Sequence, residues 1–327
     1  MSSRAVQERE VRQQGARNNA RRTRARDPVR SKQRHLTPSP RPRKQTQLSP
    51  QKNKREQRAA KAVAALDPTK TATLLLVRHG ETRWNAEGRL QGQMLPGPSL
   101  SPAGAAQARH MAAALAAEHE ISAIYSSDLA RAVETADAIA AALVPAAPVR
   151  QLPSLRERHL GALLEGVRRA DAPAAAPEAF AALRRGLRAP SEALPGGGET
   201  LDALAARVGG ALLGIARRHP GERCVVVSHG GAIHGARRYA EGAGEGGSGG
   251  GGGGGASFSA LANGALCEFR IDPEAAAAGR GGGGGRAPGG QWRGGWAVVR
   301  WGDGRLLAGL AGAAAASGTA GGGADAG

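Results

Sequence analysis

Aromatic residues make up only 3% of this 327-residue chain, and cysteine occurs twice. Two thiols are too few for a disulfide framework or a cysteine-rich metal site, and Cys224 and Cys267 both lie in apolar, strand-like surroundings, so we expect them to be buried. The sequence has no apolar run of the roughly 18 residues that a membrane span needs, and its N-terminus lacks the apolar segment of a secretory signal. These absences predict a soluble, intracellular protein without a membrane span.

Basic residues are concentrated at one end of the chain. The formal net charge is +18, and residues 1–70 alone hold 20 Lys and Arg against 5 Asp and Glu. The charge excess therefore describes this segment and does not by itself indicate that the rest of the chain binds nucleic acid. Because the segment has few clustered aliphatic residues to bury, we expect residues 1–70 to form a disordered basic tail.

The role of this tail is left open by the sequence. It is suited to weak contact with nucleic acid or another anionic surface. It is also Arg-rich and poor in acidic residues, as organelle transit segments are. We therefore predict a cytoplasmic protein, with plastid, mitochondrion or nucleus as alternatives that depend on the tail, and a homo-oligomer stays open.

The remainder predicts one α/β domain over residues 71–308, followed by a disordered tail at 309–327. Strands or extended segments are expected at 73–78, 121–127, 149–157 and within 223–231, with late or edge strands at 263–271 and 296–307. Helices are expected at 99–120, at 128–143 with Asp128 as the cap, and from Glu199 to about residue 218. This order predicts a three-layer α/β/α sandwich around a mainly parallel sheet.

Two kinds of segment interrupt this pattern. Glycine-rich stretches at 242–256 and 279–290 are expected to be flexible insertions. Residues 158–198 mix alanine, proline and arginine, and they predict only weak helical segments.

Two of the expected strands end in histidine. One apolar run leads into Arg78-His79-Gly80, and a second leads into His229-Gly230. The carboxyl ends of parallel strands meet at one edge of a sheet, where such folds bind ligands. A histidine with one ring nitrogen held by a hydrogen bond can attack an electrophile with the other, and arginines suit a dianionic phosphoryl group. The expected electrophile is therefore phosphorus.

Seven ordered motifs resemble those of the histidine phosphatase superfamily, the phosphoglycerate mutase-like proteins, over roughly residues 72–307. They are LVRHGETRWN (76–85), Gln91-Gly92, LSPAGAAQA (100–108), YSSDLARAVETA (125–136), LRERHLGALLEG (155–166), GGGETLDALAAR (196–207) and VVVSHGG (225–231).

The resemblance implies a role for each matching residue. His79 would be the nucleophile that accepts the phosphoryl group, and Glu157 would protonate the leaving oxygen and then activate water. The other implied residues surround them: Arg78, Arg131, His229 and Asn85 would form the phosphate pocket, and Gln91 and Gly92 the substrate mouth. The sequence has no ordered cluster of carboxylates, so we expect neither a metal nor a cofactor.

The sequence also departs from the family pattern. An Asp-x-Pro-Leu segment common after the Gln-Gly pair is replaced by residues 94–100, and the pair Glu165-Gly166 comes about one residue late. The segment 158–198 is rich in small residues and proline, which favours an open site and hydrolysis.

We therefore predict a phosphatase acting on a small phosphate monoester, such as a sugar phosphate or a phosphorylated acid, through a phosphohistidine. A cofactor-dependent phosphoglycerate mutase is the alternative within the family. A non-catalytic phosphate-binding or scaffold protein with a nucleic-acid-attracting tail is the alternative outside enzymes.

Overall fold

The computed structural model describes residues 60, 63–118, 120–143, 147–186, 188–242, 260–278 and 294–307. All of them fall within one compact unit, Leu48–Gly327. Several expectations lie outside the described residues: most of the tail expected at 1–70, the insertion at 242–256 after its first residue, the insertion at 279–290, and the tail at 309–327.

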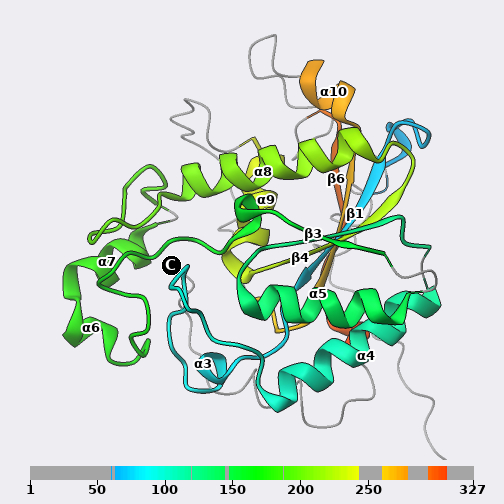
Figure 1. Cartoon of the computed structure of the whole chain (residues 1–327). Coiled ribbons are helices and arrows are strands. Elements are labelled where there is room, and N and C mark those ends of the chain that lie inside the picture. The colour runs from blue at the N-terminus through cyan, green and yellow to red at the C-terminus, as the bar shows by residue number, and fades with distance from the viewer. Residues whose placement is uncertain are drawn as a thin grey trace, which may run out of the picture. The chain divides into compact units, whose positions relative to one another are not determined.

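A six-stranded sheet in the order β3-β2-β4-β1-β5-β6 forms the centre of this unit (Figure 1). Its parallel strands are β1 (Ala72–Arg78), β2 (Ala123–Ser126), β3 (Val149–Gln151) and β4 (Arg223–Ser228). The strand β5 (Leu266–Ile271) runs antiparallel to both β1 and β6 (Trp296–Asp303). The mainly parallel sheet predicted from the sequence is confirmed, and of the two late strands only β6 lies at an edge.

Helices cover both faces of the sheet, which confirms the three-layer arrangement. The helices α4 (Pro102–Glu118) and α5 (Ala130–Ala142) lie on one face, and α8 (Leu201–Arg218), α9 (Gly230–Ala240) and α10 (Pro273–Ala278) lie on the other (Figure 1). Alternate residues of β1 serve the two faces, because Leu75 and Val77 pack with α4 and α5 whereas Leu74 and Leu76 pack with α8 and α9. A strand buried on both faces reads as a continuous apolar run.

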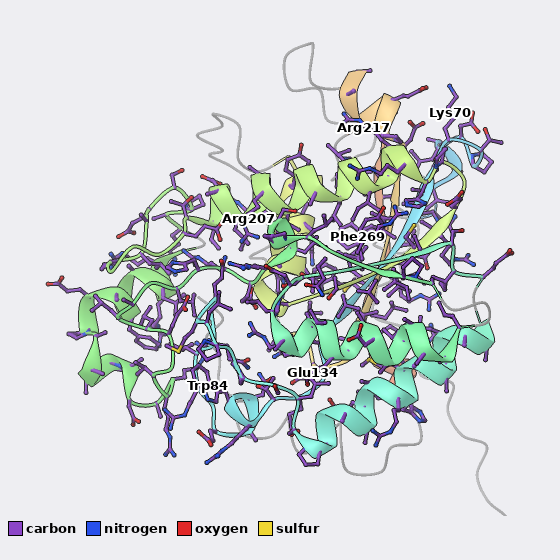
Figure 2. The ribbon with its side chains drawn as sticks, viewed as in Figure 1. Lys70, Trp84, Glu134, Arg207, Arg217 and Phe269 are labelled. Carbon is purple, nitrogen blue, oxygen red and sulfur yellow. The ribbon has the colours of Figure 1, made fainter. Side chains whose placement is uncertain are left out.

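The apolar layer under α8 holds aromatic side chains from β2, α9, β5 and β6. Phe269 of β5 is one of them and lies between the sheet and α8 (Figure 2). Cys224 and Cys267 are both free and buried in the same layer, as expected. Within the described ranges, no helix is long and apolar enough to cross a membrane.

Two expected helix starts differ in the structure. The residue capping α5 is Leu129, which offers no side-chain hydrogen bond, so the prediction of Asp128 as the cap is wrong. Asp128 instead accepts two hydrogen bonds from Arg156, at 2.7 and 2.6 Å. A bidentate pair between two charged groups is stronger than a bond from the carboxylate to a neutral backbone N–H, and it draws the carboxylate away from the helix. The helix expected from Glu199 begins at Leu201 and is capped by Thr200, whose hydroxyl accepts from the Ala203 N–H.

The segment 158–198, which follows Glu157, contains more regular helical structure than its composition predicted. It forms α6 (Ala172–Ala175) and α7 (Pro177–Arg185), which lie beside the sheet layers rather than on them (Figure 1). These helices bury a third apolar cluster of their own, which includes Leu90, Leu164 and Leu194. The remaining short elements are α3 (Arg83–Ala86) and the 3-10 turns η1 (Pro153–Leu155) and η2 (Arg305–Leu307).

Candidate active site

His79 stands at the carboxyl end of β1 with its ring held in one tautomer. The Nδ1 atom lies 2.7 Å from the carbonyl oxygen of Gly80. Because a carbonyl oxygen only accepts hydrogen bonds, Nδ1 carries the proton and Nε2 keeps its lone pair. The backbone is fixed as well, since the N–H of His79 donates to Ser228 and its carbonyl accepts from Asn263. Nε2 is therefore an unprotonated ring nitrogen at a fixed position, as the predicted nucleophile requires.

The surroundings keep this ring neutral. Burial, together with the guanidinium groups of Arg131 and Arg78, holds the pKa of His79 well below its usual value. Burial and the charge of Arg131 likewise hold the pKa of His229 well below its usual value. The two imidazole rings lie with their centroids 5.1 Å apart. Two neutral histidines between two arginines are the core of the site.

These lowered pKa values make stability fall in acid. Below pH about 6.5, histidine in the unfolded chain takes up a proton that folded His79 and His229 do not. We therefore expect the free energy of unfolding to drop, by up to about 1.4 kcal/mol per pH unit for each histidine. Urea denaturation at a series of pH values measures this slope. An identical slope in the double variant His79→Gln/His229→Gln would contradict the assignment.

Arg131 reaches His79 from the first turn of α5. It is only 1% exposed, and burial lowers its pKa to about 10, which leaves it charged at neutral pH. Its Nε lies 3.3 Å from His79 Nε2, and its Nη2 donates to the Gly92 carbonyl at 2.9 Å. Gly92 has a φ of +54°, and a Cβ there would lie 2.1 Å from Glu165 Oε1. Gly92 was expected at the substrate mouth, and the structure places its carbonyl against Arg131.

Three buried donors around His79 have no hydrogen-bond partner among the described residues. They are Arg78 Nε, Arg131 Nη1 and His229 Nδ1. Arg78 is anchored through its Nη1, which donates to the Leu261 carbonyl. Buried polar groups without partners are costly and rare, so their gathering at one point indicates a binding site. Donors of this kind fit the oxygens of a phosphoryl group.

Ser127 contacts one ring nitrogen of His229 and leaves the other without a partner among the described residues. Its Oγ lies 2.9 Å from His229 Nε2 and accepts from the Leu129 N–H at 3.3 Å. With the Ser127 hydroxyl donating to Nε2, the single proton of the neutral ring stays on Nδ1. The unpartnered Nδ1 is then a donor, as an anion requires. Ser127 lies within the motif at 125–136, but nothing in the sequence indicated this role.

Glu157 lies next to this cluster and is held by backbone groups. Its Oε1 accepts from the N–H groups of Arg158 at 2.8 Å and Ala232 at 3.0 Å, and its Oε2 accepts from Gly231 at 3.1 Å. Gly231 and Ala232 form the first turn of α9, whose N–H groups favour a negative charge. A Cβ on Gly231 would lie 2.4 Å from Oε1, so only glycine leaves room for the carboxylate. The charge of Glu157 also opposes the lowering of the Arg78 and Arg131 pKa values by burial.

The remaining expected residues are placed less directly. Asn85 uses its Oδ1 to accept from the N–H and hydroxyl of Thr82, and from Asn263 at 3.3 Å. Because Asn263 also donates to the His79 carbonyl, Asn85 is linked to the nucleophile through it. Gln91 has a buried Oε1 without a partner among the described residues, and its role at the substrate mouth stays a prediction.

Sequence reasoning missed two further residues that hold the His79 loop. Asn263 follows the glycine-rich insertion, and only its place just before β5 distinguishes it in the sequence. Thr135 lies one turn after Arg131 in α5, and its hydroxyl accepts from the Gly80 N–H at 3.1 Å. Within the described part of the chain, no three or more His, Cys, Asp or Glu side chains are grouped to hold a metal ion.

Known proteins are similar to this chain. The family model described as histidine phosphatase superfamily (branch 1) matches residues 74–261. Phosphoglycerate mutase-like protein 4 of Arabidopsis thaliana is 44% identical over 162 residues, which are 50% of this chain and 68% of that protein. The metal-independent phosphoserine phosphatase of the same plant is 43% identical over 160 residues, which are 49% of this chain and 65% of that protein.

A solved structure is also similar to this chain. The mycobacterial glucosyl-3-phosphoglycerate phosphatase is 26% identical, with a TM-score of 0.53, and the match covers 71% of this chain and 98% of that one. The family match begins in β1 and continues through α9, so it includes both histidine-bearing strand ends and the segment that carries Glu157. The chain belongs to the histidine phosphatase superfamily.

Proposed function

We propose that this chain is a phosphatase that hydrolyses a small phosphate monoester through a phosphohistidine on His79. The observation that carries the proposal is the set of three unpartnered buried donors around a neutral His79 whose Nε2 is free of a proton. An arrangement with fixed positive charge and a fixed nucleophile suits phosphoryl transfer, in which a protein contributes mainly positioning and charge stabilisation.

The first step transfers the phosphoryl group to the protein. The lone pair of His79 Nε2 attacks phosphorus, a P–N bond forms, and the bond to the leaving oxygen breaks. Arg78, Arg131 and His229 donate to the phosphoryl oxygens, so that charge is neutralised as it moves. Glu157, as the acid, gives its proton to the leaving oxygen, and an alcohol departs.

The second step releases phosphate. Glu157, now ionised, takes a proton from a water molecule, which attacks phosphorus. The P–N bond breaks, and inorganic phosphate departs. His79 is then neutral again, with its proton still on Nδ1. One carboxyl group thus acts as acid and then as base.

The proposed substrate class rests on the names of two related phosphatases. The two named phosphatases in the comparison act on phosphoserine and on glucosyl-3-phosphoglycerate, and both compounds combine a phosphate monoester with a carboxylate. We propose a phosphorylated small acid as the substrate, and L-phosphoserine is the first compound to test.

The mutase alternative is favoured by relatives named as a phosphoglycerate mutase-like protein and as probable phosphoglycerate mutases. Incubation with 3-phosphoglycerate and 2,3-bisphosphoglycerate separates the two activities. Hydrolysis predicts inorganic phosphate, and the appearance of 2-phosphoglycerate would overturn our assignment. A non-catalytic binding role would leave all of these compounds unchanged.

Activity is expected to be the same in the presence of a strong metal chelator. In this mechanism Arg78, Arg131 and His229 supply the positive charge that Mg²⁺ supplies in kinases. Release of inorganic phosphate from L-phosphoserine and from an aryl phosphate, with and without EDTA, measures this. A loss of activity in EDTA that added metal restores would contradict the mechanism.

A further inference from the structure

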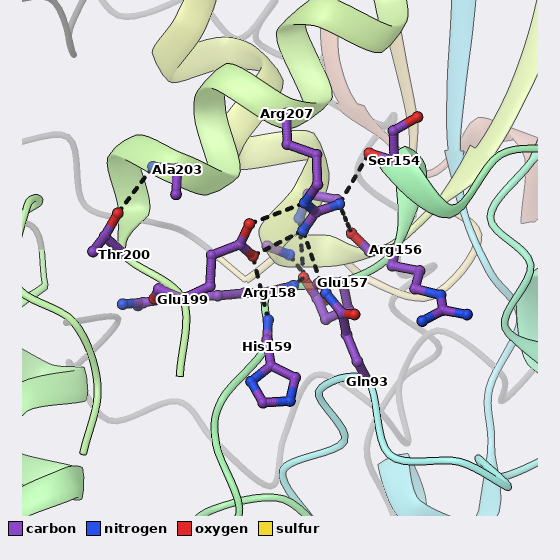
Figure 3. A network of polar contacts seen from close by, with 12 residues as sticks. Gln93, Ser154, Arg156, Glu157, Arg158, His159, Glu199, Thr200, Ala203 and Arg207 are labelled. Atoms are coloured by element: carbon purple, nitrogen blue, oxygen red, sulfur yellow. Dashed lines mark hydrogen bonds and ion pairs between the residues drawn. The ribbon is translucent and has the colours of Figure 1, made fainter. Parts of the chain in front are cut away.

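The backbone that carries Glu157 depends on one arginine from a distant helix. Residues 156–160, all of them described, form neither helix nor strand, so their carbonyls have no partners from regular structure. Arg207 donates through Nη1 to the carbonyls of Ser154 at 2.9 Å and Arg156 at 3.0 Å. Its Nη2 donates to the carbonyl of Glu157 itself at 3.2 Å (Figure 3). Three carbonyls around the candidate acid thus converge on one guanidinium group.

Glu199 accepts the remaining hydrogen bonds of Arg207. Its Oε1 accepts from Nε at 2.9 Å, and its Oε2 accepts from Nη2 at 2.8 Å. All five N–H bonds of the guanidinium group therefore have an acceptor. A lysine has only three donors on one nitrogen and cannot reproduce this planar pattern.

Arg207 is anchored outside the loop, and Glu199 is bonded to the loop itself. Arg207 comes from α8, where its neighbours Leu204, Ala205 and Val208 are buried in the core. Glu199 pairs with the residues next to Glu157, because its N–H donates to the His159 carbonyl at 2.7 Å and its own carbonyl accepts from Arg158 Nε at 2.9 Å. The pair is also shielded, with side chains only 23% and 14% exposed.

The opposite side of Glu157 is held by separate groups. Its carboxylate accepts from the first turn of α9, and its carbonyl also accepts from Gln93 Nε2 at 2.7 Å. Arg207 fixes only the backbone from which this side chain extends. Small displacements of a catalytic group are enough to lower a rate. Loss of Arg207 should therefore misalign the carboxyl group without removing it.

We propose that Arg207, oriented by Glu199, is a positioning residue for proton transfer by Glu157. The inference rests on the proposed function, in which Glu157 protonates the leaving oxygen. It predicts that the loss in a variant depends on how much the leaving group needs that proton. A nitrophenolate leaves without a proton, whereas the alkoxide of an alkyl phosphate needs one.

The test compares kcat/KM for two substrates, because this ratio reports the steps up to the first transfer to His79. Arg207→Ala should lower kcat/KM by about 10- to 100-fold for the alkyl phosphate that the wild type hydrolyses best, L-phosphoserine or glycerol phosphate. It should lower kcat/KM by less than about threefold for p-nitrophenyl phosphate. Glu157→Gln should show the same selectivity more strongly, and Arg207→Lys should fall between Arg207→Ala and the wild type.

Arg238→Ala is the matched control, because Arg238 forms a comparable ion pair with Asp202 at 2.7 Å and does not touch the loop. It should leave both ratios unchanged. If Arg207→Ala does not fold, the isosteric Glu199→Gln carries the same test. Equal losses on the two substrates would overturn the positioning role while the wild type still forms phosphohistidine. A wild type that neither hydrolyses these compounds nor forms phosphohistidine would instead overturn the proposed function.

Discussion

Replacing His79 by alanine is expected to lower kcat by about 10⁴-fold or more, because the variant loses the nucleophile and with it the covalent step. The His79 ring contacts the Gly80 carbonyl through Nδ1 and Arg131 Nε through Nε2. Among the described residues, no other histidine makes these two contacts. Steady-state release of phosphate from an alkyl and an aryl phosphate measures the loss.

The same variant should still bind inorganic phosphate. Arg78, Arg131 and His229 remain in place, so affinity falls much less than turnover. Thermal unfolding with and without phosphate reports this binding, since a ligand of the folded state raises its stability. Turnover by His79→Ala equal to that of the wild type would end the histidine mechanism. His110→Ala, in α4, is the control for replacing a histidine outside the site.

Replacing Arg131 by methionine is expected to lower kcat/KM by about 10³-fold or more, which is the effect of removing an arginine from a phosphoryl-transfer site. Arg131 contacts both His79 Nε2 and the Gly92 carbonyl, and its third nitrogen is directed to no described partner. Arg131→Lys should rescue little, because a single ammonium group cannot reach all of these positions.

The fold should tolerate this change well. Arg131 is a buried cation beside Arg78, and burial already lowers its pKa to about 10. Replacing a buried charge by an apolar side chain of similar volume is often neutral or stabilising.

The variant lacks one of the groups proposed to bind phosphate. We expect phosphate to raise the melting temperature of the wild type and not that of the variant. Arg185→Met, which removes an exposed arginine of α7, is the control. Wild-type kcat/KM in Arg131→Met would contradict the pocket assignment.

The fold was largely predictable because its signals are local. The run before Arg78 is uninterrupted because both faces of β1 are covered, and the same holds for the run before His229 in β4. The edge strand β6 and the internal strand β5 had similar patterns, and only the pairing of β5 with β1 distinguishes them. The order of strands in a sheet depends on tertiary contacts. It therefore cannot be read from the spacing of apolar residues or from the composition.

The errors arose where a side chain had a better partner far away in sequence. Asp128 looked like a helix cap, but Arg156 offers it two charged hydrogen bonds. Residues 158–198 looked weakly helical because they mix alanine, proline and arginine, yet Leu90 joins them from another segment to complete a cluster. Neither competition is visible within a short sequence window.

The sequence motifs name the residues predicted to react, and the structure adds the residues that hold them in place. His79, Arg131 and His229 belong to motifs that the family resemblance identified. Asn263 follows an insertion, and Ser127 acts only through His229, so no motif indicates either role. Arg207 was quoted within a motif, and its five hydrogen bonds became visible only when α8 and the Glu157 loop were placed together.

Trapping of the intermediate tests the central claim most directly. The full-length protein is mixed with a substrate that carries a radiolabelled phosphoryl group, quenched within a single turnover in alkaline detergent, and digested for peptide mapping. We predict label on the peptide that contains His79, stable in base and lost in acid, and no such label on His79→Ala. A wild-type enzyme that turns over without this label, or that carries it on another residue, would contradict the account.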